Sequence, residues 1–207
     1  MGTTYLYAKH DNTTPITNIH IPKCGSTSTS EFYENCITYG YVQGIHKLNA
    51  DVNHRGVTFT VLREPLGRFK SNVNYFLQNN RKEIVFTRDE VIDISLNYTY
   101  TNEEMSNVLE YSSKDAEPEI NIVLHSLSIF DSFYNVFDEN KNLKAKHLLN
   151  IKNLKQELEN ILPDWEYKHF PHTNRSKGED FALTNEQLDK FNYKYREDIE
   201  FYKQTGF

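Results

Sequence analysis

Two short β-rich runs, each ending in a polar loop, constrain the fold of this chain more than any other feature. They cover Thr17–Ile21 and Val57–Leu62, and the second (VTFTVL) has the pattern of a buried strand. Helical patterns follow both runs, over about 27–38 and 66–77. Strands that alternate with helices predict an α/β fold with a central, mainly parallel sheet flanked by helices. Such sheets bind ligands at the carboxyl ends of their strands, where both loops lie.

The remainder of the chain continues the alternation. In chain order we expect helices over 87–98 and 102–112, a helix followed by a loop or strand over 120–137, a strand over 146–151 and a helix over 153–162. The last segment predicts one long helix, which begins with a Thr184–Gln187 capping box and ends near Gly206. Its apolar stripe should face the core and consists of Leu188, Phe191, Tyr195, Ile199 and Tyr202.

Length and charge narrow the class of protein. The 207 residues fit a single domain over 1–207, with a helical insertion at about 79–121. A net charge of −6 argues against a general nucleic-acid binder, which needs a basic face. Two cysteines are too few for a disulfide framework, and no apolar run is long enough to cross a membrane. The first residues lack a signal-peptide pattern, so we expect a cytoplasmic protein without a membrane partner.

The loop after the first strand has the chemistry of a phosphate-binding loop. Gly25 lets the backbone approach an oxyanion, Lys23 adds a cation, and Ser26, Thr27 and Ser28 add hydroxyl donors at a helix N-terminus. The order differs from a Walker A loop, because the lysine precedes the glycine. A Ser/Thr-rich helix cap after a strand also occurs without any ligand, and the loop alone leaves that alternative open.

The loop after the second strand adds an arginine and a serine. Arg63 stands at the strand end and suits bidentate phosphate binding, and Ser71 lies about two helical turns further on. The alternative for Arg63 is a salt bridge with Glu64 or another acidic residue.

Together these segments resemble sulfotransferases that use 3′-phosphoadenosine 5′-phosphosulfate (PAPS). The run from His20 to Ser28 (HIPKCGSTS) is similar to their 5′-phosphosulfate loop, often written HIPKTGGTS. The run from Leu62 to Ser71 (LREPLGRFKS) is similar to their 3′-phosphate motif, LRDPVERFxS. A third segment at 171–178, with the tyrosine-rich end of the chain, resembles the family's nucleotide loop and last helix. The carbohydrate branch, including the heparan sulfate 2-O type, is the most similar.

The resemblance implies a P-loop-like three-layer fold and a role for each matched residue. The 5′-phosphosulfate would be held by Lys23, Cys24, Gly25, Ser26, Thr27 and Ser28. Arg63 and Ser71 would hold the 3′-phosphate, and Arg175, Ser176 and Lys177 would close over the nucleotide. Lys23 would also stabilise charge on the leaving phosphate. PAPS would be the co-substrate and 3′-phosphoadenosine 5′-phosphate (PAP) the product, and this chemistry requires no metal.

The general base is less constrained by the sequence. By resemblance to a Gly-x-His element, His46 is the candidate, with His54 as a competitor. His20 is expected to orient the loop, whereas His125 and His147 are expected to be structural. Cys24 and Ser26 replace the commoner Thr and Gly of the family. No base that would activate Cys24 as a nucleophile can be assigned.

Two other functions stay open on the sequence alone. A P-loop nucleotide kinase would need a Walker lysine and a magnesium site, and a non-catalytic module would bind only the nucleotide. For a sulfotransferase, the acceptor would be a small molecule or an oligosaccharide with a hydroxyl or amine. The sequence leaves the acceptor and the oligomeric state open.

Overall fold

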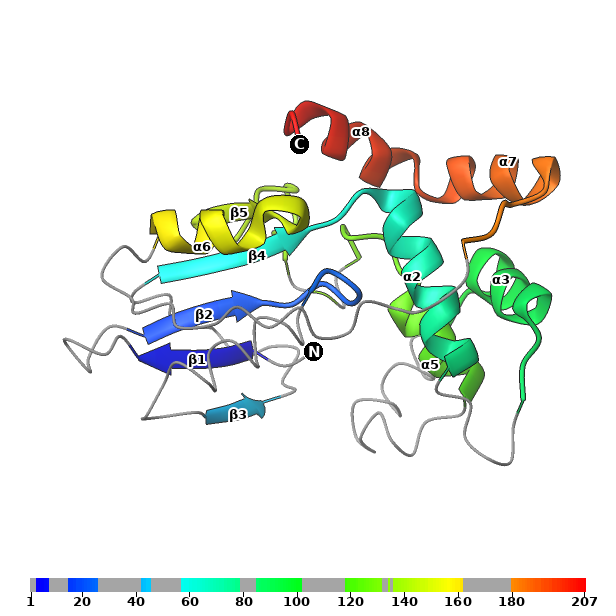
Figure 1. Cartoon of the computed structure of the whole chain (residues 1–207), viewed down its shortest axis with the longest axis horizontal. Coiled ribbons are helices and arrows are strands. Elements are labelled where there is room, and N and C mark those ends of the chain that lie inside the picture. The colour runs from blue at the N-terminus through cyan, green and yellow to red at the C-terminus, as the bar shows by residue number, and fades with distance from the viewer. Residues whose placement is uncertain are drawn as a thin grey trace. The chain divides into compact units, whose positions relative to one another are not determined.

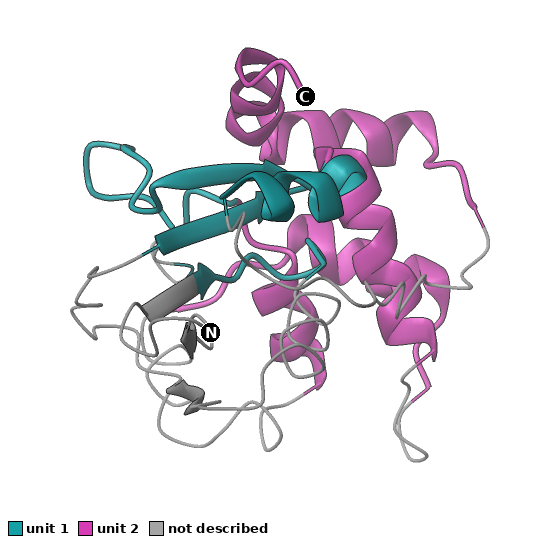
Figure 2. Cartoon of the chain, turned by 60° about the vertical axis from the view of Figure 1, so that its left-hand side comes forward, with its two compact units in different colours: residues 1–63, 129–175 teal, residues 64–128, 176–207 magenta. Residues whose placement is uncertain are grey.

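The computed structural model describes residues 3–7, 15–25, 42–45, 57–78, 85–101, 118–131, 134, 136–161 and 180–207, and only the backbone of 3–7, 15–17 and 42–45. The chain forms two compact units (Figure 2). The first comprises residues 1–63 and 129–175, and the second comprises residues 64–128 and 176–207. The expectation of one sulfotransferase domain over 1–207 stays a prediction.

The first unit is built on a five-stranded sheet with the order β3-β1-β2-β4-β5 (Figure 1). Its strands are β1 (Thr3–Tyr7), β2 (Pro15–Ile19), β3 (Val42–Ile45), β4 (Val57–Leu62) and β5 (His147–Asn150). Strands β2, β4 and β5 are parallel, whereas β1 runs antiparallel to both of its neighbours. The α/β class is therefore confirmed, but the parallel part of this sheet has three strands.

Strand β4 is the buried centre of the parallel part, as its sequence predicts. Phe59, Thr60 and Val61 are each at most 3% exposed. The Thr60 hydroxyl donates to the Ile19 carbonyl at 2.7 Å, and Thr58 accepts from the Lys146 N–H at 2.9 Å. These bonds satisfy the two buried hydroxyls, so threonine and apolar residues can alternate in a strand with no exposed face.

Beyond β5 the chain enters a short 3₁₀ turn, η2 (Ile151–Asn153), and helix α6 (Leu154–Ile161). Helix α6 packs beside β5 (Figure 1) and buries Leu154 and Leu158. The expected strand at 146–151 and helix at 153–162 are confirmed within one residue at each end.

The second unit consists of helices in the part that the structure describes. They are α2 (Pro65–Gln78), α3 (Arg88–Asn97), α5 (Pro118–His125), α7 (Asn185–Lys194) and α8 (Arg196–Gln204). Their apolar core contains Phe69, Val73, Val91, Ile92, Leu96, Ile122, Phe181, Phe191 and Tyr195. The helices expected at 66–77 and 87–98 are confirmed, and the one expected at 102–112 lies outside the described residues. So does the helix expected at 27–38.

The single long helix expected at the C-terminus is wrong, because Tyr195 interrupts it. The Thr184–Gln187 capping box forms as predicted, and Gly206 takes a left-handed φ of 73° after α8. Tyr195 leaves helical geometry at φ −104° and ψ 20°, is 3% exposed, and donates its hydroxyl to the Ser126 carbonyl. Within the stripe, Phe191 and Tyr195 are core residues, but Leu188 is 38% exposed.

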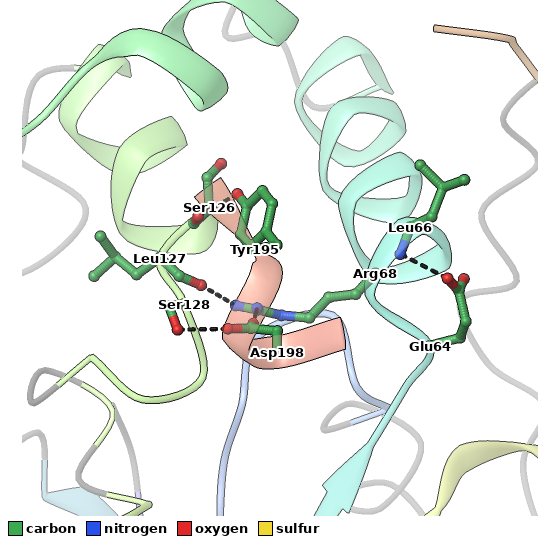
Figure 3. A network of polar contacts seen from close by, with 8 residues as sticks. All are labelled: Glu64, Leu66, Arg68, Ser126, Leu127, Ser128, Tyr195 and Asp198. Atoms are coloured by element: carbon green, nitrogen blue, oxygen red, sulfur yellow. Dashed lines mark hydrogen bonds and ion pairs between the residues drawn. The ribbon is translucent and has the colours of Figure 1, made fainter. Parts of the chain in front are cut away.

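A buried polar network joins α2 and α8 to the segment that follows α5 (Figure 3). The Arg68 guanidinium of α2 lies 3.5 Å from the Asp198 carboxylate of α8, and both side chains are at most 5% exposed. Arg68 also donates to the Leu127 carbonyl at 2.8 Å, and Ser128 donates to Asp198. The network satisfies a charge that would otherwise be costly to bury.

Candidate functional site

The loop after β2 begins as a tight, buried turn. Ile21 and Cys24 are 1% and 2% exposed, and the Cys24 N–H donates to the Ile21 carbonyl at 3.3 Å. Between them Lys23 takes a left-handed φ of 65°, which is costly for a residue with a Cβ. Backbone strain of this kind persists where surrounding structure imposes it, and it concentrates at functional sites.

Gly25 is the point at which this loop meets the element after β5. Its φ is 80°, and a Cβ on it would lie 3.4 Å from both Ile151 Cδ1 and Leu154 Cδ2. The glycine is therefore favoured by its left-handed backbone conformation, and its Cα lies close to the two side chains that follow β5.

Arg63 extends from the end of β4 to the same loop. Its Nη1 donates to the carbonyl oxygen of Lys23 at 3.3 Å, across 40 positions of sequence. Strands β2 and β4 are parallel neighbours, so their carboxyl ends lie at one edge of the sheet. The structure thus brings together the two cations that the two motifs predicted.

Glu64, the alternative partner of Arg63, has another role. Its two carboxylate oxygens accept the N–H groups of Leu66 and Gly67, at 3.0 and 2.5 Å. These are unsatisfied donors in the first turn of α2, so Glu64 caps that helix.

Burial and the nearby Arg63 change the pKa of Lys23. Burial, and then the positive charge of Arg63, lowers the pKa of Lys23 from 10.5 to about 8, against a smaller opposing contribution from Cys24. A group with this pKa is still mainly charged at neutral pH. An anion bound here would relieve the repulsion between the two cations and favour the charged form. Lys23, Gly25 and Arg63 therefore form a candidate anion site with a loop backbone able to approach its ligand.

Ser71, the other residue expected at the 3′-phosphate, lies on α2 in the second unit and is 7% exposed. Lys23, Cys24, Gly25 and Arg63 belong to the first unit. The remaining candidates lie outside the described residues: Ser26, Thr27, Ser28, His46, His54, Arg175, Ser176 and Lys177.

The described histidines occupy different settings. His20 follows β2 directly and is partly buried, beside the loop that it is expected to orient. His125 ends α5, where its Nδ1 lies 2.8 Å from the Asn121 carbonyl and its ring contacts Tyr75 and Phe76. This packing supports the structural role expected for His125. His147 begins β5.

Two residues near the candidate site were missed by sequence reasoning. Asn150 ends β5 and is 4% exposed, and its N–H donates to the Glu157 carboxylate at 2.6 Å. The signal available in the sequence was an asparagine near the end of the strand expected at 146–151. Nothing local to Glu157 distinguishes it from the other acidic residues of α6.

Two features are absent from the part of the chain that the structure describes. No group of three or more His, Cys, Asp or Glu side chains in those ranges is placed to hold a metal ion. None of the described helices is both long and apolar enough to cross a membrane. The absence of a metal requirement stays a prediction.

Comparison of the chain with protein-family models, curated proteins and solved structures found no match.

Proposed function

We propose that this chain is a PAPS-dependent sulfotransferase that transfers a sulfuryl group to an acceptor hydroxyl, with a carbohydrate as the expected acceptor. The observation that carries the proposal is the hydrogen bond from Arg63 Nη1 to the Lys23 carbonyl. It joins the two segments that resemble the phosphosulfate and 3′-phosphate motifs of that family. The finer fold assignment, a P-loop-like three-layer arrangement, belongs to the same proposal.

The chemistry suits the residues of the loop. The bond between sulfur and the bridging oxygen of the 5′-phosphate breaks as a bond from the acceptor oxygen to sulfur forms in line. Negative charge then grows on the departing phosphate, and the Lys23 ammonium is the group proposed to stabilise it. His46 is the proposed acceptor of the proton that the hydroxyl loses. Positioning and charge stabilisation supply the rate enhancement.

The segment from Leu62 to Ser71 is proposed to discriminate between PAPS and ATP. ATP lacks a 3′-phosphate, so a guanidinium committed to that group favours the adenosine bisphosphate. Arg63 and Ser71 are proposed to bind it, while Arg175, Ser176 and Lys177 close over the nucleotide. Arg63 suits this role because a guanidinium presents a fork of donors that matches the oxygens of a phosphate.

Calorimetric titration with PAP and, separately, with ATP tests the proposal. Wild-type protein should bind PAP with micromolar affinity and ATP weakly. Lys23→Ala and Arg63→Ala should each weaken PAP binding by about tenfold or more, the value of one charge-assisted hydrogen bond. Lys155→Ala is the matched control, because Lys155 is an exposed cation of the same unit that pairs with Glu159 at 3.4 Å. Absence of PAP binding by the wild type would overturn the proposal.

A further inference from the structure

The turn between β5 and α6 is held by two side-chain hydrogen bonds. The Asn150 N–H donates to Glu157 Oε2 at 2.6 Å, and Asn150 Oδ1 accepts from the Lys152 N–H at 2.9 Å. Asn150 is only 4% exposed, so its N–H needs a protein partner once β5 has ended. Glu157 supplies that partner from the first turn of α6 and so fixes the path of the chain between strand and helix.

This turn contacts the candidate site from one side. Ile151 and Leu154 are the residues that a Cβ at Gly25 would meet, so the phosphate loop rests directly on the turn. The side chain of Leu154 is 4% exposed and belongs to the buried face of α6. A shift of the turn would therefore be transmitted to the backbone at Gly25.

The same turn also adjoins the strand that presents Arg63. Asn150 is the register partner of Leu62 in the parallel ladder of β4 and β5. The residue after Leu62 is Arg63, which donates to the Lys23 carbonyl at 3.3 Å. The turn that begins at Asn150 thus adjoins β4, which carries Arg63, and the loop that carries Lys23.

We propose that Glu157 is a positioning residue that holds the β5–α6 turn against the phosphate loop and so keeps Lys23 and Arg63 in register for the phosphosulfate. The inference rests on the proposed function for its ligand but on the geometry of the turn for its mechanism. Removing the carboxylate leaves the Asn150 N–H without its acceptor, and the turn must move to find another. Phosphate sites are sensitive to such displacements, because a misplacement of about 1 Å can cost about 10²-fold in rate.

Three substitutions separate this role from simple stabilisation of α6. Glu157→Ala removes the acceptor, Glu157→Gln keeps an acceptor oxygen without the charge, and Glu157→Asp keeps the charge but is one methylene shorter. Glu159→Ala is the matched control, since Glu159 lies on the same helix and pairs with Lys155. PAP affinity and unfolding midpoints are measured on the full chain, with binding recorded well below the midpoint.

The proposal expects Glu157→Ala and Glu157→Asp to weaken PAP binding by about tenfold or more, the value of one hydrogen bond between a displaced cation of the loop and a phosphate of PAP. Glu157→Gln should stay close to wild type, as should Glu159→Ala. If Glu157→Ala does not fold, the PAP affinity of Glu157→Asp tests the inference instead. A lowered midpoint with unchanged PAP affinity in the folded variants would show that Glu157 only stabilises the helix and would overturn the inference.

A second readout needs no ligand and separates this inference from the proposed function. The Lys23 ammonium can be titrated by NMR after isotopic methylation of lysines and assigned with Lys23→Arg. Wild type should titrate near the pKa of about 8, and Glu157→Ala should move the value toward 10.5 as the loop becomes more open. A wild type that binds no PAP sinks the sulfotransferase proposal, and this titration then decides the inference alone. An unmoved titration in Glu157→Ala would overturn it.

Discussion

Lys23 combines three unfavourable conditions in one residue. Its backbone is left-handed, its ammonium group is largely buried, and a guanidinium lies close enough to lower its pKa. None of these conditions stabilises the folded chain, because the charged form is disfavoured by burial and by the like charge. A negatively charged ligand would remove part of the cost of burying the charged Lys23 ammonium. This is the reason for proposing an anion site at Lys23.

Anion binding should therefore depend on the protonation of Lys23. The bound anion favours the charged ammonium, so binding takes up a proton at pH values above the free pKa of about 8. PAP affinity should be nearly constant just below that pH and fall by up to about tenfold per pH unit above it. Titrations over a pH series measure this. In Lys23→Arg the cation stays charged, so the decline should vanish. A decline that persists in that variant would contradict the assignment.

Gly25 offers a direct test of the loop conformation. Gly25→Ala puts a residue with a Cβ at φ 80°, with side-chain neighbours at 3.4 Å, whereas Gly206→Ala, at φ 73°, meets nothing within 4 Å. Each should lose about 1 kcal/mol in the free energy of unfolding from the unfavourable backbone, because a Cβ at Gly25 makes only ordinary contacts. Urea unfolding measures both losses. Only Gly25→Ala should weaken PAP binding, and unchanged PAP affinity in that variant would argue against an anion site at this loop.

At the scale of elements, Arg68 shows how a motif residue can be structural. It lies inside the segment that resembles the 3′-phosphate motif, yet its guanidinium is buried and committed to Asp198 and to the Leu127 carbonyl (Figure 3). The pair links α2 to α8, so it orders the helix that carries Ser71. Resemblance located the segment, and only the three-dimensional contacts separate a ligand contact from a structural ion pair.

Breaking this pair should cost more than breaking a surface pair. Arg68→Met leaves the buried Asp198 carboxylate without its cation and should cost about 3–5 kcal/mol in the free energy of unfolding. The double variant Arg68→Met with Asp198→Leu should recover most of that loss. Lys190→Ala breaks the exposed pair with Glu186 and should cost less than about 1 kcal/mol. Chemical denaturation measures all three, and equal costs for Arg68→Met and Lys190→Ala would contradict the argument.

At the scale of the whole molecule, the kinase and sulfotransferase hypotheses differ in the metal and the nucleotide that the protein would require. With EDTA present, PAP at about 100 times its dissociation constant should stabilise the chain by about 2.7 kcal/mol. ATP under the same conditions should leave the unfolding midpoint almost unchanged. Differential scanning calorimetry measures the shift, with Arg63→Ala as the variant expected to respond weakly. Stabilisation by magnesium-ATP but not by PAP would favour the kinase.

Catalysis is the second molecular criterion, and it separates an enzyme from a binding module. Once an acceptor is identified, Lys23→Ala should lower kcat by about 10²-fold or more, as the loss of one donor to a developing anion does. A module that only binds nucleotide would show affinity for PAP and no turnover with any acceptor.

Local patterns were sufficient for the elements whose stabilising interactions are local. The VTFTVL run predicted β4 at its observed ends, and the Thr184–Gln187 capping box marked the start of α7, because burial pattern and helix caps depend on neighbouring residues. Lys23, Gly25 and Arg63 were identifiable for the same reason, since each follows a recognisable strand. Strands β1 (TTYLY) and β3 (VQGI) were not foreseen, because neither has the long apolar run that marked β4. Strand β1 pairs with β2, its neighbour in the chain, and with β3, about 40 positions further on.

Tertiary structure decided the features that depend on distant partners. The break falls at Tyr195, whose hydroxyl donates to the distant Ser126 carbonyl, and the buried Arg68 is paired with Asp198, about 130 positions away. Three contacts likewise arise only after the strands pair. They are the approach of Gly25 to Ile151, the hydrogen bond from Arg63 to the Lys23 carbonyl and the hydrogen bond from the Asn150 N–H to Glu157. The sequence by itself determined which residues bear charge and where the locally stabilised elements, such as β4 and the start of α7, begin. The fold determined which of those charges meet, because that depends on strand order and packing.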